Sequence, residues 1–440
     1  MIQRISVLIL FLTGGLVAPA QTALSLEEAI ARGLENNYDI RLQREQHEVA
    51  ELNNTILNTG MFPQLTAGLR SNDRYSTIDN TNNPFTFFAG KVSTNSLTAT
   101  PFVQLNWRLF NGLRGFATRE RLDLLEEQSM GNVELVVENT VQAIILAYFQ
   151  AVLQQERLAV LRDVSALSRD RLRRAEDARA IGVEATFDVL QLRRSALADS
   201  VNVLNQEVAV RTARRQLQVL LGAEGAPDWV LSDGLDRAFA ELPLADLEAD
   251  MLEDNQNLRN QFINLRLQEN QVKQVRGDFM PTLDVQGGWD YAFNRTQVIE
   301  PDQLARSTTL GFFVNFALQF NLFNGGQAFR SMEEARIQEA VAELSVEQMS
   351  HRLRQELRDA HDLYQARLRV LRVQDQLVDD ASLQLELARD RLDRGLISSL
   401  DFRDVQLAAL DARLARLQTL YDLSESRANL LQLTGGILAY

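Results

Sequence analysis

The chain has 440 residues, of which 45 are basic and 59 acidic, so its net charge is −14. This acidic balance argues against binding to nucleic acid, which requires a basic surface. The chain has no cysteine, which excludes disulfides, thiolate chemistry and cysteine-ligated zinc.

The first twenty residues have the pattern of a signal peptide. Arg4 precedes a short apolar run at residues 5–12, and Ala18 and Ala20 occupy the small-residue positions of a cleavage site. We therefore predict a signal peptide at residues 1–20, with an uncleaved N-terminal anchor as the alternative. No other stretch approaches twenty apolar residues, which predicts that no helix crosses a membrane.

An internal repeat organises the rest of the chain. The sequence Leu-Phe-Asn-Gly at residues 109–112 recurs at 322–325, which is 213 positions later (325 − 112). The same offset carries Gly182 onto Gly395. Repeats of this length indicate that one structural unit occurs twice.

We predict two structural repeats, at residues 21–225 and 226–440, joined by a linker around residues 225–227. Pro63 matches Pro281 at an offset of 218, so the first copy has five extra residues (218 − 213). Each copy is expected to contain a helix, two strands, a long helix, a turn and a further helix.

Long helices are predicted where proline is absent. No proline lies between Pro101 and Pro227 or after Pro301, and these stretches are rich in good helix formers. Residues 326–394 would form a rod of about 100 Å. Its apolar residues follow a heptad, which predicts packing against neighbouring helices: Leu357, Tyr364, Leu371, Val378, Leu385 and Leu392. A second stripe suggests contacts on two sides: Leu363, Val370 and Leu377. An ordinary coiled-coil dimer is the alternative.

Four segments alternate between apolar and polar residues in the manner of strands. They are residues 65–75, 97–109, 283–294 and 310–322. Alternation over about ten residues, with aromatic side chains on the apolar face, is typical of strands that cross an outer membrane. A soluble antiparallel sheet is the alternative.

Four membrane strands cannot form a closed barrel alone. A bilayer admits only closed barrels, and known single-chain barrels begin at about eight strands. Two copies would enclose little open space, whereas three would give twelve strands around a conduit. The expected fold class is mainly α with transmembrane β: four strands per subunit complete a trimeric twelve-stranded outer-membrane barrel, and long coiled helices form a periplasmic α-barrel.

The chain resembles the TolC family of outer-membrane efflux proteins over almost its whole mature length. The resemblance is carried by Leu-Ser-Leu-Glu-Glu-Ala-Ile at 24–30, Phe-Pro-Gln-Leu at 62–65, both Leu-Phe-Asn-Gly motifs and two glycine turns followed by an acid. It implies a homotrimer in the outer membrane, with its helical part in the periplasm. It also implies a periplasmic adaptor protein and an inner-membrane transporter of the RND or ABC type as partners.

Residues at the helix turns are expected to bind the adaptor. The segments at 180–189 and 394–402 match the periplasmic helix turns of the family, which implies docking at Gly182, Val183, Gly395 and Leu396. Glycine permits the left-handed backbone that ends a helix, and the following Ser or Thr is suited to cap the next helix.

Three acids near these turns are candidate channel residues. In the family an Asp pair three residues apart lines the closed tunnel end, and here that spacing gives Asp401 and Asp404. Three subunits would form rings of carboxylates that attract cations. For Asp401 and for Asp188 of the first copy, capping of the helix is the alternative. The aromatic and Arg that latch the gate in some members are Leu392 and Ile397 here.

No enzyme site, cofactor site or metal site is expected. The three histidines, His47, His351 and His361, do not share a helix face at ligand spacing, and no phosphate-binding loop or nucleophile motif is present. The expected function is a passive outer-membrane export duct in a tripartite efflux or type I secretion system. The alternative is a structural periplasmic coiled-coil protein without a pore.

Overall fold

The computed structural model describes residues 23–82, 90–183, 185–223, 229–299 and 302–439. The predicted signal peptide and the linker at residues 225–227 fall outside these, so the boundary between the two repeats stays a prediction. The chain divides into two compact units, each drawn from several segments. One contains described residues of 43–134 and 256–352, and the other contains those of 1–42, 135–255 and 353–440.

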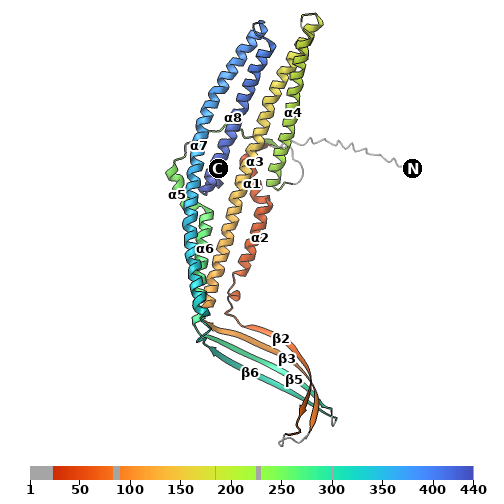
Figure 1. The fold of residues 1–440 in the computed structure, drawn as a ribbon, viewed down its shortest axis with the longest axis vertical. Coiled ribbons are helices and arrows are strands. Elements are labelled where there is room, and N and C mark those ends of the chain that lie inside the picture. The colour runs from red at the N-terminus through yellow and green to blue at the C-terminus, as the bar shows by residue number, and fades with distance from the viewer. Residues whose placement is uncertain (1–22, 83–89, 184, 224–228, 300–301, 440) are drawn as a thin grey trace, which may run out of the picture. The chain divides into compact units, whose positions relative to one another are not determined.

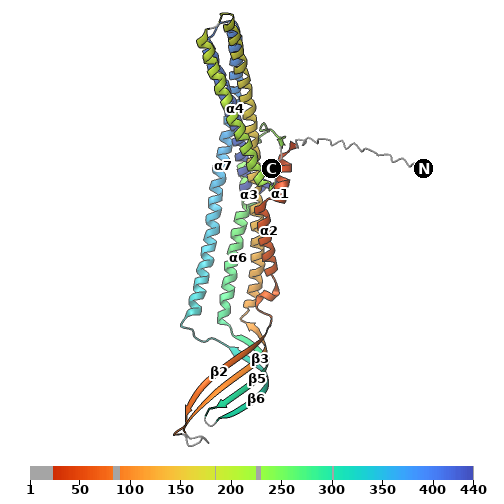
Figure 2. The same cartoon turned by 90° about the vertical axis from the view of Figure 1, so that its right-hand side faces the viewer.

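The first unit contains a four-stranded antiparallel sheet, which confirms the predicted strands (Figures 1 and 2). The strands are β2 (Gln64–Asp79), β3 (Lys91–Asn111), β5 (Thr282–Val298) and β6 (Gln303–Gln319), in the order β2-β3-β5-β6. Strands β3 and β5 bring the two halves of the sequence together at the centre. Strands β2 and β6 form the two edges.

Strand β6 ends earlier than predicted. The alternation continues to Leu322, but β6 ends at Gln319, which pairs with Thr282. The residue before Thr282 is Pro281, which has no N–H to continue the ladder. The sequence pattern extends beyond the point where β5 can supply a partner.

The register places apolar side chains on one face of the sheet. On edge strand β6, every second residue is apolar and well exposed: Phe312 (76%), Val314 (65%), Phe316 (71%) and Leu318 (74%). Their ladder partners on β5 include Trp289 and Val285, which lie on the same face. The exposed apolar face therefore runs across the sheet, as the alternation predicts.

The opposite face carries a row of amide side chains. Gln64 pairs with Asn106, Asn106 with Gln286, and Gln286 with Asn315, so one amide from each strand lies in a line straight across the sheet. The Gln286 amide donates to Asn106 at 3.2 Å. Along this row the face therefore presents uncharged hydrogen-bonding groups.

The Leu-Phe-Asn-Gly motifs form the corners from strand to helix. Gly112 and Gly325 both have a positive φ, of 68° and 69°. A Cβ on Gly112 would lie 2.5 Å from the carbonyl oxygen of Gly277, so only glycine fits. The following residue differs between the copies: Gly326 has φ 74°, whereas Leu113 has φ 66°.

Leu113→Gly is expected to stabilise the protein by up to about 1 kcal/mol. A left-handed backbone costs an L-residue about 1–2 kcal/mol, and the greater freedom of an unfolded glycine offsets part of the gain. The leucine is 49% exposed, so little packing is lost. Thermal unfolding of the purified protein measures the change. Gly326→Leu is the matched control and should destabilise; a loss of stability in both variants would contradict the argument.

The helices of the chain are α1 (Leu26–Asn36), α2 (Tyr38–Asn53), α3 (Arg114–Ala180), α4 (Thr186–Leu220), α5 (Leu244–Asp254), α6 (Gln256–Arg276), α7 (Gln327–Asp393) and α8 (Ser399–Leu433). They include two hairpins, α3 with α4 and α7 with α8, each closed by a glycine turn. Helices α3 and α7 have 67 residues each, and α4 and α8 have 35 each. Short elements complete the fold: β1 (Ala23–Leu24), β4 (Val230–Leu231), η1 (Ile56–Thr59), η2 (Gly277–Phe279) and η3 (Gly436–Ala439).

The core of the second unit forms around the middle of α3. Helix α3 supplies Val141, Ile144, Ile145 and Phe149, none of which is exposed. The sequence predicted no membrane-crossing helix, yet α3 contains an 18-residue window apolar enough to cross one, 44% of it buried. Its contribution to this core accounts for that composition.

The sequence missed a break in the first helix of each copy. Helix α1 ends where the Asn37 side chain donates to the carbonyl of Leu220 at 2.9 Å. Helix α5 ends in the same way, because Asn255 donates to Leu433, also at 2.9 Å. These contacts fasten each broken helix to the end of α4 or α8.

The two heptad stripes of α7 have different surroundings. Leu357 and Tyr364 of the first stripe are fully buried. Leu363, Val370 and Leu377 of the second stripe are 48%, 46% and 48% exposed. The second stripe is therefore only partly covered within the described chain.

Candidate functional site

The turn between α3 and α4 is built around Gly182. Its φ of 78° lets the chain reverse, and its N–H donates to Arg179 at 2.9 Å. The Val183 N–H donates to Ala178 at 3.0 Å, which completes a Schellman ending of α3. The turn therefore forms as the sequence predicts.

The turn between α7 and α8 repeats this geometry. Gly395 has φ 69°, its N–H donates to Leu392 at 2.9 Å, and the Leu396 N–H donates to Arg391 at 2.8 Å. Two helices of the same unit thus end in the same motif, one in each copy.

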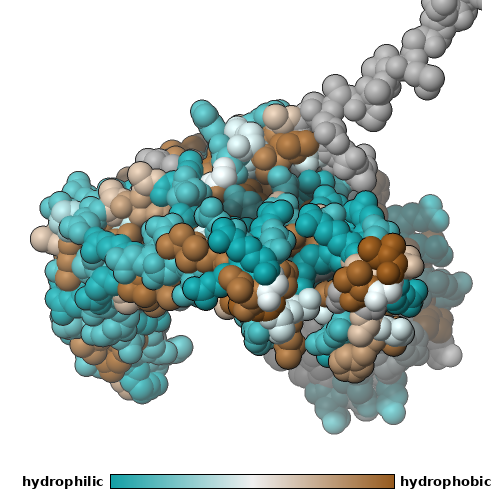
Figure 3. Space-filling model, turned by 90° about the horizontal axis from the view of Figure 1, so that it is seen from above, coloured by the Kyte–Doolittle hydropathy of each residue, from teal (hydrophilic) through white to brown (hydrophobic). Residues whose placement is uncertain are grey.

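The tips of both turns expose apolar side chains. Ile181, Val183 and Leu396 are 78%, 75% and 68% exposed. Figure 3, which looks down on the molecule from above, shows apolar residues scattered among hydrophilic ones. Exposed apolar side chains on a polar background are a common basis for protein contacts.

Asp401 caps helix α8. The Ser398 hydroxyl accepts from the Asp401 N–H at 3.1 Å, and an Asp401 carboxylate oxygen accepts from the Ser398 N–H at 3.1 Å, which is a capping box. Hydrogen bonds from the Ser398 side chain and backbone lower the pKa of this exposed carboxyl. Because the pKa is lowered on folding, this contribution to stability is present above the ordinary Asp pKa and is lost as the pH falls through the folded value.

Asp404 and Asp188 make no such cap. Asp404 is exposed one turn further into α8, beside Asp401 on the same helix face. Asp188 is half-buried in the first turn of α4. The cap of α4 is Ala185, which makes no side-chain hydrogen bond, so the expectation of a Ser or Thr cap is wrong for Thr186. The chain reaches Thr186 already in helical conformation, one position too late to cap.

A buried charged network lies behind the acidic pair. The Arg403 guanidinium donates to both carboxylate oxygens of Asp199, at 2.8 and 2.7 Å. The Ser168 hydroxyl donates to Asp199 at 2.6 Å, and Gln406 lies within 3.5 Å of Ser168. Asp199, Ser168 and Gln406 are each at most 5% exposed. The network joins helices α3, α4 and α8.

This network was not predicted from the sequence, although one signal was present. Asp199 and Arg403 are 204 positions apart, so no spacing rule relates them. However, Asp199 lies three residues after Ala196, on the face that α4 buries. A lone acid on a buried helix face predicts a charged partner.

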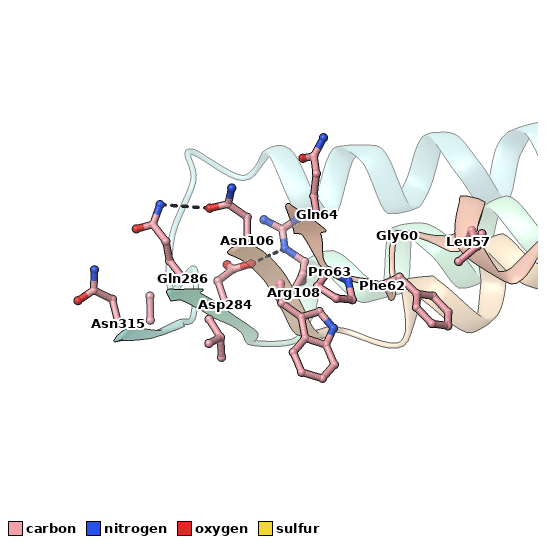
Figure 4. Close-up of a pocket in the computed structure, with 13 residues that line it drawn as sticks. Leu57, Gly60, Phe62, Pro63, Gln64, Asn106, Arg108, Asp284, Gln286 and Asn315 are labelled. Carbon is pink, nitrogen blue, oxygen red and sulfur yellow. Dashed lines mark hydrogen bonds and ion pairs between the residues drawn. The ribbon is translucent and has the colours of Figure 1, made fainter. Parts of the chain in front are cut away.

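A groove opens on the amide face of the sheet, near the corner into the helices (Figure 4). In Figure 4 the amides of Asn106 and Gln286 point toward each other, and Arg108 contacts Asp284, with the two charged atoms 2.7 Å apart. Because the arginine and the acid neutralise each other, the groove carries no net charge, and its lining combines these polar groups with apolar side chains such as Phe62 and Trp107. Among the described residues, no group of three or more His, Asp or Glu side chains is arranged to hold a metal ion.

Comparison with known proteins identifies related sequences. A family model described as outer membrane efflux protein matches residues 248–436. The probable efflux pump outer membrane protein SepC of Pseudomonas putida is 23% identical over 419 residues, covering 93% of this chain and 83% of its own length.

Solved structures share the fold. The outer-membrane channel OprN superposes with a TM-score of 0.73 at 20% identity, covering 93% of this chain and 90% of its own. The channel CusC superposes with a TM-score of 0.74 at 17% identity, covering 93% and 92%. These similarities confirm the resemblance found in the sequence. The chain therefore shares its fold with these outer-membrane channels, and its second half matches the outer membrane efflux protein model.

Proposed function

We propose that this chain is the outer-membrane channel subunit of a tripartite efflux or type I secretion system. Three copies form a passive export duct, with a barrel in the outer membrane and helices in the periplasm. The duct holds no energy source of its own, so transport is driven by an inner-membrane pump of the RND or ABC type. The match to the outer membrane efflux protein model and the fold shared with outer-membrane channels favour this function over a structural coiled-coil protein without a pore.

The observation that carries the proposal is the open sheet. Its apolar face is exposed along strands of 16 to 21 residues, long enough to cross a bilayer when tilted. Its opposite face is polar, as the water-filled side of a channel requires. Edge strands of this length are rare in soluble proteins because they promote aggregation, and closure of a barrel removes them.

Exposed apolar stripes on the helices support the same assembly. Helix α4 exposes side chains at coiled-coil spacing: Leu190 (53%), Leu197 (62%), Val201 (54%), Leu204 (62%) and Val208 (50%). Helix α7 exposes its second stripe, described above. The exposed stripes of α4 and α7 are suited to pack against each other between neighbouring copies, which would join the helices of the copies into a continuous barrel.

The helix tips are the proposed docking surface for the periplasmic adaptor. Gly182 and Gly395 place Val183 and Leu396 at the ends of the two hairpins, where both side chains are largely exposed. An adaptor that presents complementary apolar residues would bury them. The exposed backbone of each glycine turn would lie at the same contact.

The acidic pair is proposed to attract cations at the periplasmic end of the duct. Asp404→Ala is expected to weaken the block of single-channel current by multivalent cations added on the periplasmic side, because three carboxylates are lost per trimer. Adding Asp401→Ala should weaken the block further. Asp188→Ala is the matched control and should matter less, since Gln191 stands where a second acid would be. Unchanged block in the double variant would remove the cation ring and leave Asp401 as a capping residue only.

The function itself is tested by reconstitution. The purified mature protein should run as a trimer on unboiled gels, dissociate on boiling and form conducting pores in planar bilayers. Deleting residues 64–79 should abolish the pores by removing an edge strand. A monodisperse protein that is soluble without detergent and forms no pores would support the coiled-coil alternative.

A further inference from the structure

Two arginines face each other near the far end of the sheet. Arg295 of β5 and Arg306 of β6 are direct ladder partners, so their side chains lie on the same face. Like charges placed directly opposite destabilise a sheet. Neither guanidinium has an ion-pair partner among the described residues. Because β6 is an edge strand, Arg306 has an open position on its other side.

The two edge strands of the sheet are suited to pair with each other. This inference rests on the proposed trimer, in which edge β6 of one copy meets edge β2 of the next. The two edges match in length, with 17 and 16 residues. Both expose apolar residues on one face, so a second copy of this chain continues the sheet without a change of chemistry. What the proposed function leaves open is the register of that pairing.

Two physical conditions restrict the register. The direct pairing from Gln64 across to Asn315 provides a reference level within one copy. We define the shift between copies as zero when Gln64 of the next copy faces Asn315, so that any displacement along the strands arises at the junction. A closed barrel needs stagger, since its strands tilt by about 35–45°, so the junction between copies must supply it. The shift must also be an even number of residues, because an odd shift would exchange the two faces.

The size of the shift follows from the tilt. A shift of two residues per copy would tilt the strands by only about 20°, whereas four gives about 35° and six about 45°. The shift must move Gln64 toward the end of β6 at Gln319. In the opposite direction, a shift of six would leave only residues 64–70 of β2 facing β6.

Side-chain pairing separates a shift of four from a shift of six. With a shift of six, Arg306 lies opposite Asp79 of the next copy, and Thr77 lies opposite Thr308. With a shift of four, Arg306 lies opposite Thr77, and Asp79 lies opposite Leu304. Opposite charges and Thr–Thr pairs stabilise neighbouring strands, whereas a charge against leucine does not.

The end of β6 favours the same register. Phe320 and Asn321 continue the alternation beyond Gln319, but β5 offers them no partner, and Phe320 is 53% exposed. A shift of six brings Leu65 of the next copy opposite Phe320 and Gln64 opposite Asn321. Each of these pairs combines residues of like polarity on the correct face. The extra length of the sequence pattern is thereby explained.

We propose that β6 of one copy pairs with β2 of the next in the register that places Arg306 opposite Asp79 and Phe316 opposite Leu69. The salt bridge between copies then offsets the repulsion between Arg306 and Arg295. The subunit boundary is also the place where the barrel acquires its stagger.

Disulfide cross-linking reads this register directly, because the chain has no cysteine of its own. Leu69→Cys combined with Phe316→Cys should form trimers that survive boiling after mild oxidation and disappear on reduction. Leu69→Cys combined with Val314→Cys, or with Leu318→Cys, should cross-link at least about tenfold less, since diagonal neighbours lie about 7–8 Å apart, beyond the usual Cα separation of a disulfide.

The outcomes distinguish the register from the channel. Efficient cross-linking at Val314 or Leu318 instead of Phe316 would overturn the register while the barrel stands. Heat-labile trimers without any of these cross-links would show that β2 and β6 do not meet in this register, which also overturns it. Absence of trimers altogether would be a failure of the proposed function.

A charge exchange tests the salt bridge independently. Asp79→Arg should lower the temperature at which trimers dissociate on gels, and adding Arg306→Asp should restore it. Asp73→Arg is the matched control, because Asp73 is on the same face of β2 but would lie opposite Phe312. Rescue of Asp73→Arg by Arg306→Asp, or none of Asp79→Arg, would contradict the register.

Discussion

Replacing Asp199 by alanine is expected to destabilise the protein by about 3–5 kcal/mol. The variant would leave the Arg403 guanidinium, whose side chain is only 15% exposed, without its charge partner among buried groups. Ser168 would lose its acceptor as well. Unfolding of the detergent-solubilised protein, followed by loss of helical circular dichroism, measures the change.

A matched pair on the same helix serves as the control. Glu207 of α4 forms an ion pair with Arg162 at 2.7 Å, but the two side chains are 30% and 59% exposed. Solvent screens such a pair, so Glu207→Ala should cost about 1 kcal/mol or less. Equal losses in the two variants would mean that the Asp199 network is no stronger than a surface pair.

A double variant distinguishes the loss of the ion pair from the cost of leaving a buried charge without a partner. Asp199→Ala with Arg403→Met removes both charges, and methionine fills part of the space. If most of the cost comes from the unpaired guanidinium, the double variant should be more stable than Asp199→Ala alone. Additive losses would show instead that the network contributes through its hydrogen bonds and packing.

Phe316→Arg is expected to block insertion of the barrel or assembly of the trimer. Phe316 lies on the apolar face and is 71% exposed, so in the membrane an arginine there would face lipid, at a cost that reaches roughly 2–4 kcal/mol per subunit at the bilayer midplane. The fraction of heat-labile trimer in isolated outer membranes measures the effect.

The neighbouring residue is the control for this substitution. Asn315 occupies the amide row on the opposite face, so Asn315→Arg would place the charge toward water. It should assemble nearly as well as the unmodified protein. Equal tolerance of arginine at the two positions would show that the assignment of the faces, or of the membrane, is wrong.

The periodic elements of this fold could be predicted because their signal is local. Alternation located all four strands, and the absence of proline located α3 and α7. The end of β6 was missed because it depends on Pro281, which directly precedes the neighbouring strand β5. The pairing of β3 with β5 joins residues 171 to 204 positions apart, and the alternation within either strand does not indicate its partner.

The candidate site was predictable in part for the same reason. The glycines predicted both turns, and the spacing from Ser398 to Asp401 predicted the capping box. The pairing of Asp199 with Arg403 depends on which helices become neighbours, and sequence spacing contains no such information. The breaks at Asn37 and Asn255 were missed because their cause is a distant carbonyl group.

The unequal caps of α4 and α8 imply unequal local dynamics at the two tips. Helix α8 begins with a reciprocal capping box, whereas α4 begins at Ala185 without any side-chain acceptor. The first amides of α4 are therefore protected by fewer hydrogen bonds and should exchange with deuterium faster than the corresponding amides of α8. The α4 end is therefore expected to fray more readily than the α8 end, so a contact surface made from both tips would combine a flexible element with a rigid one.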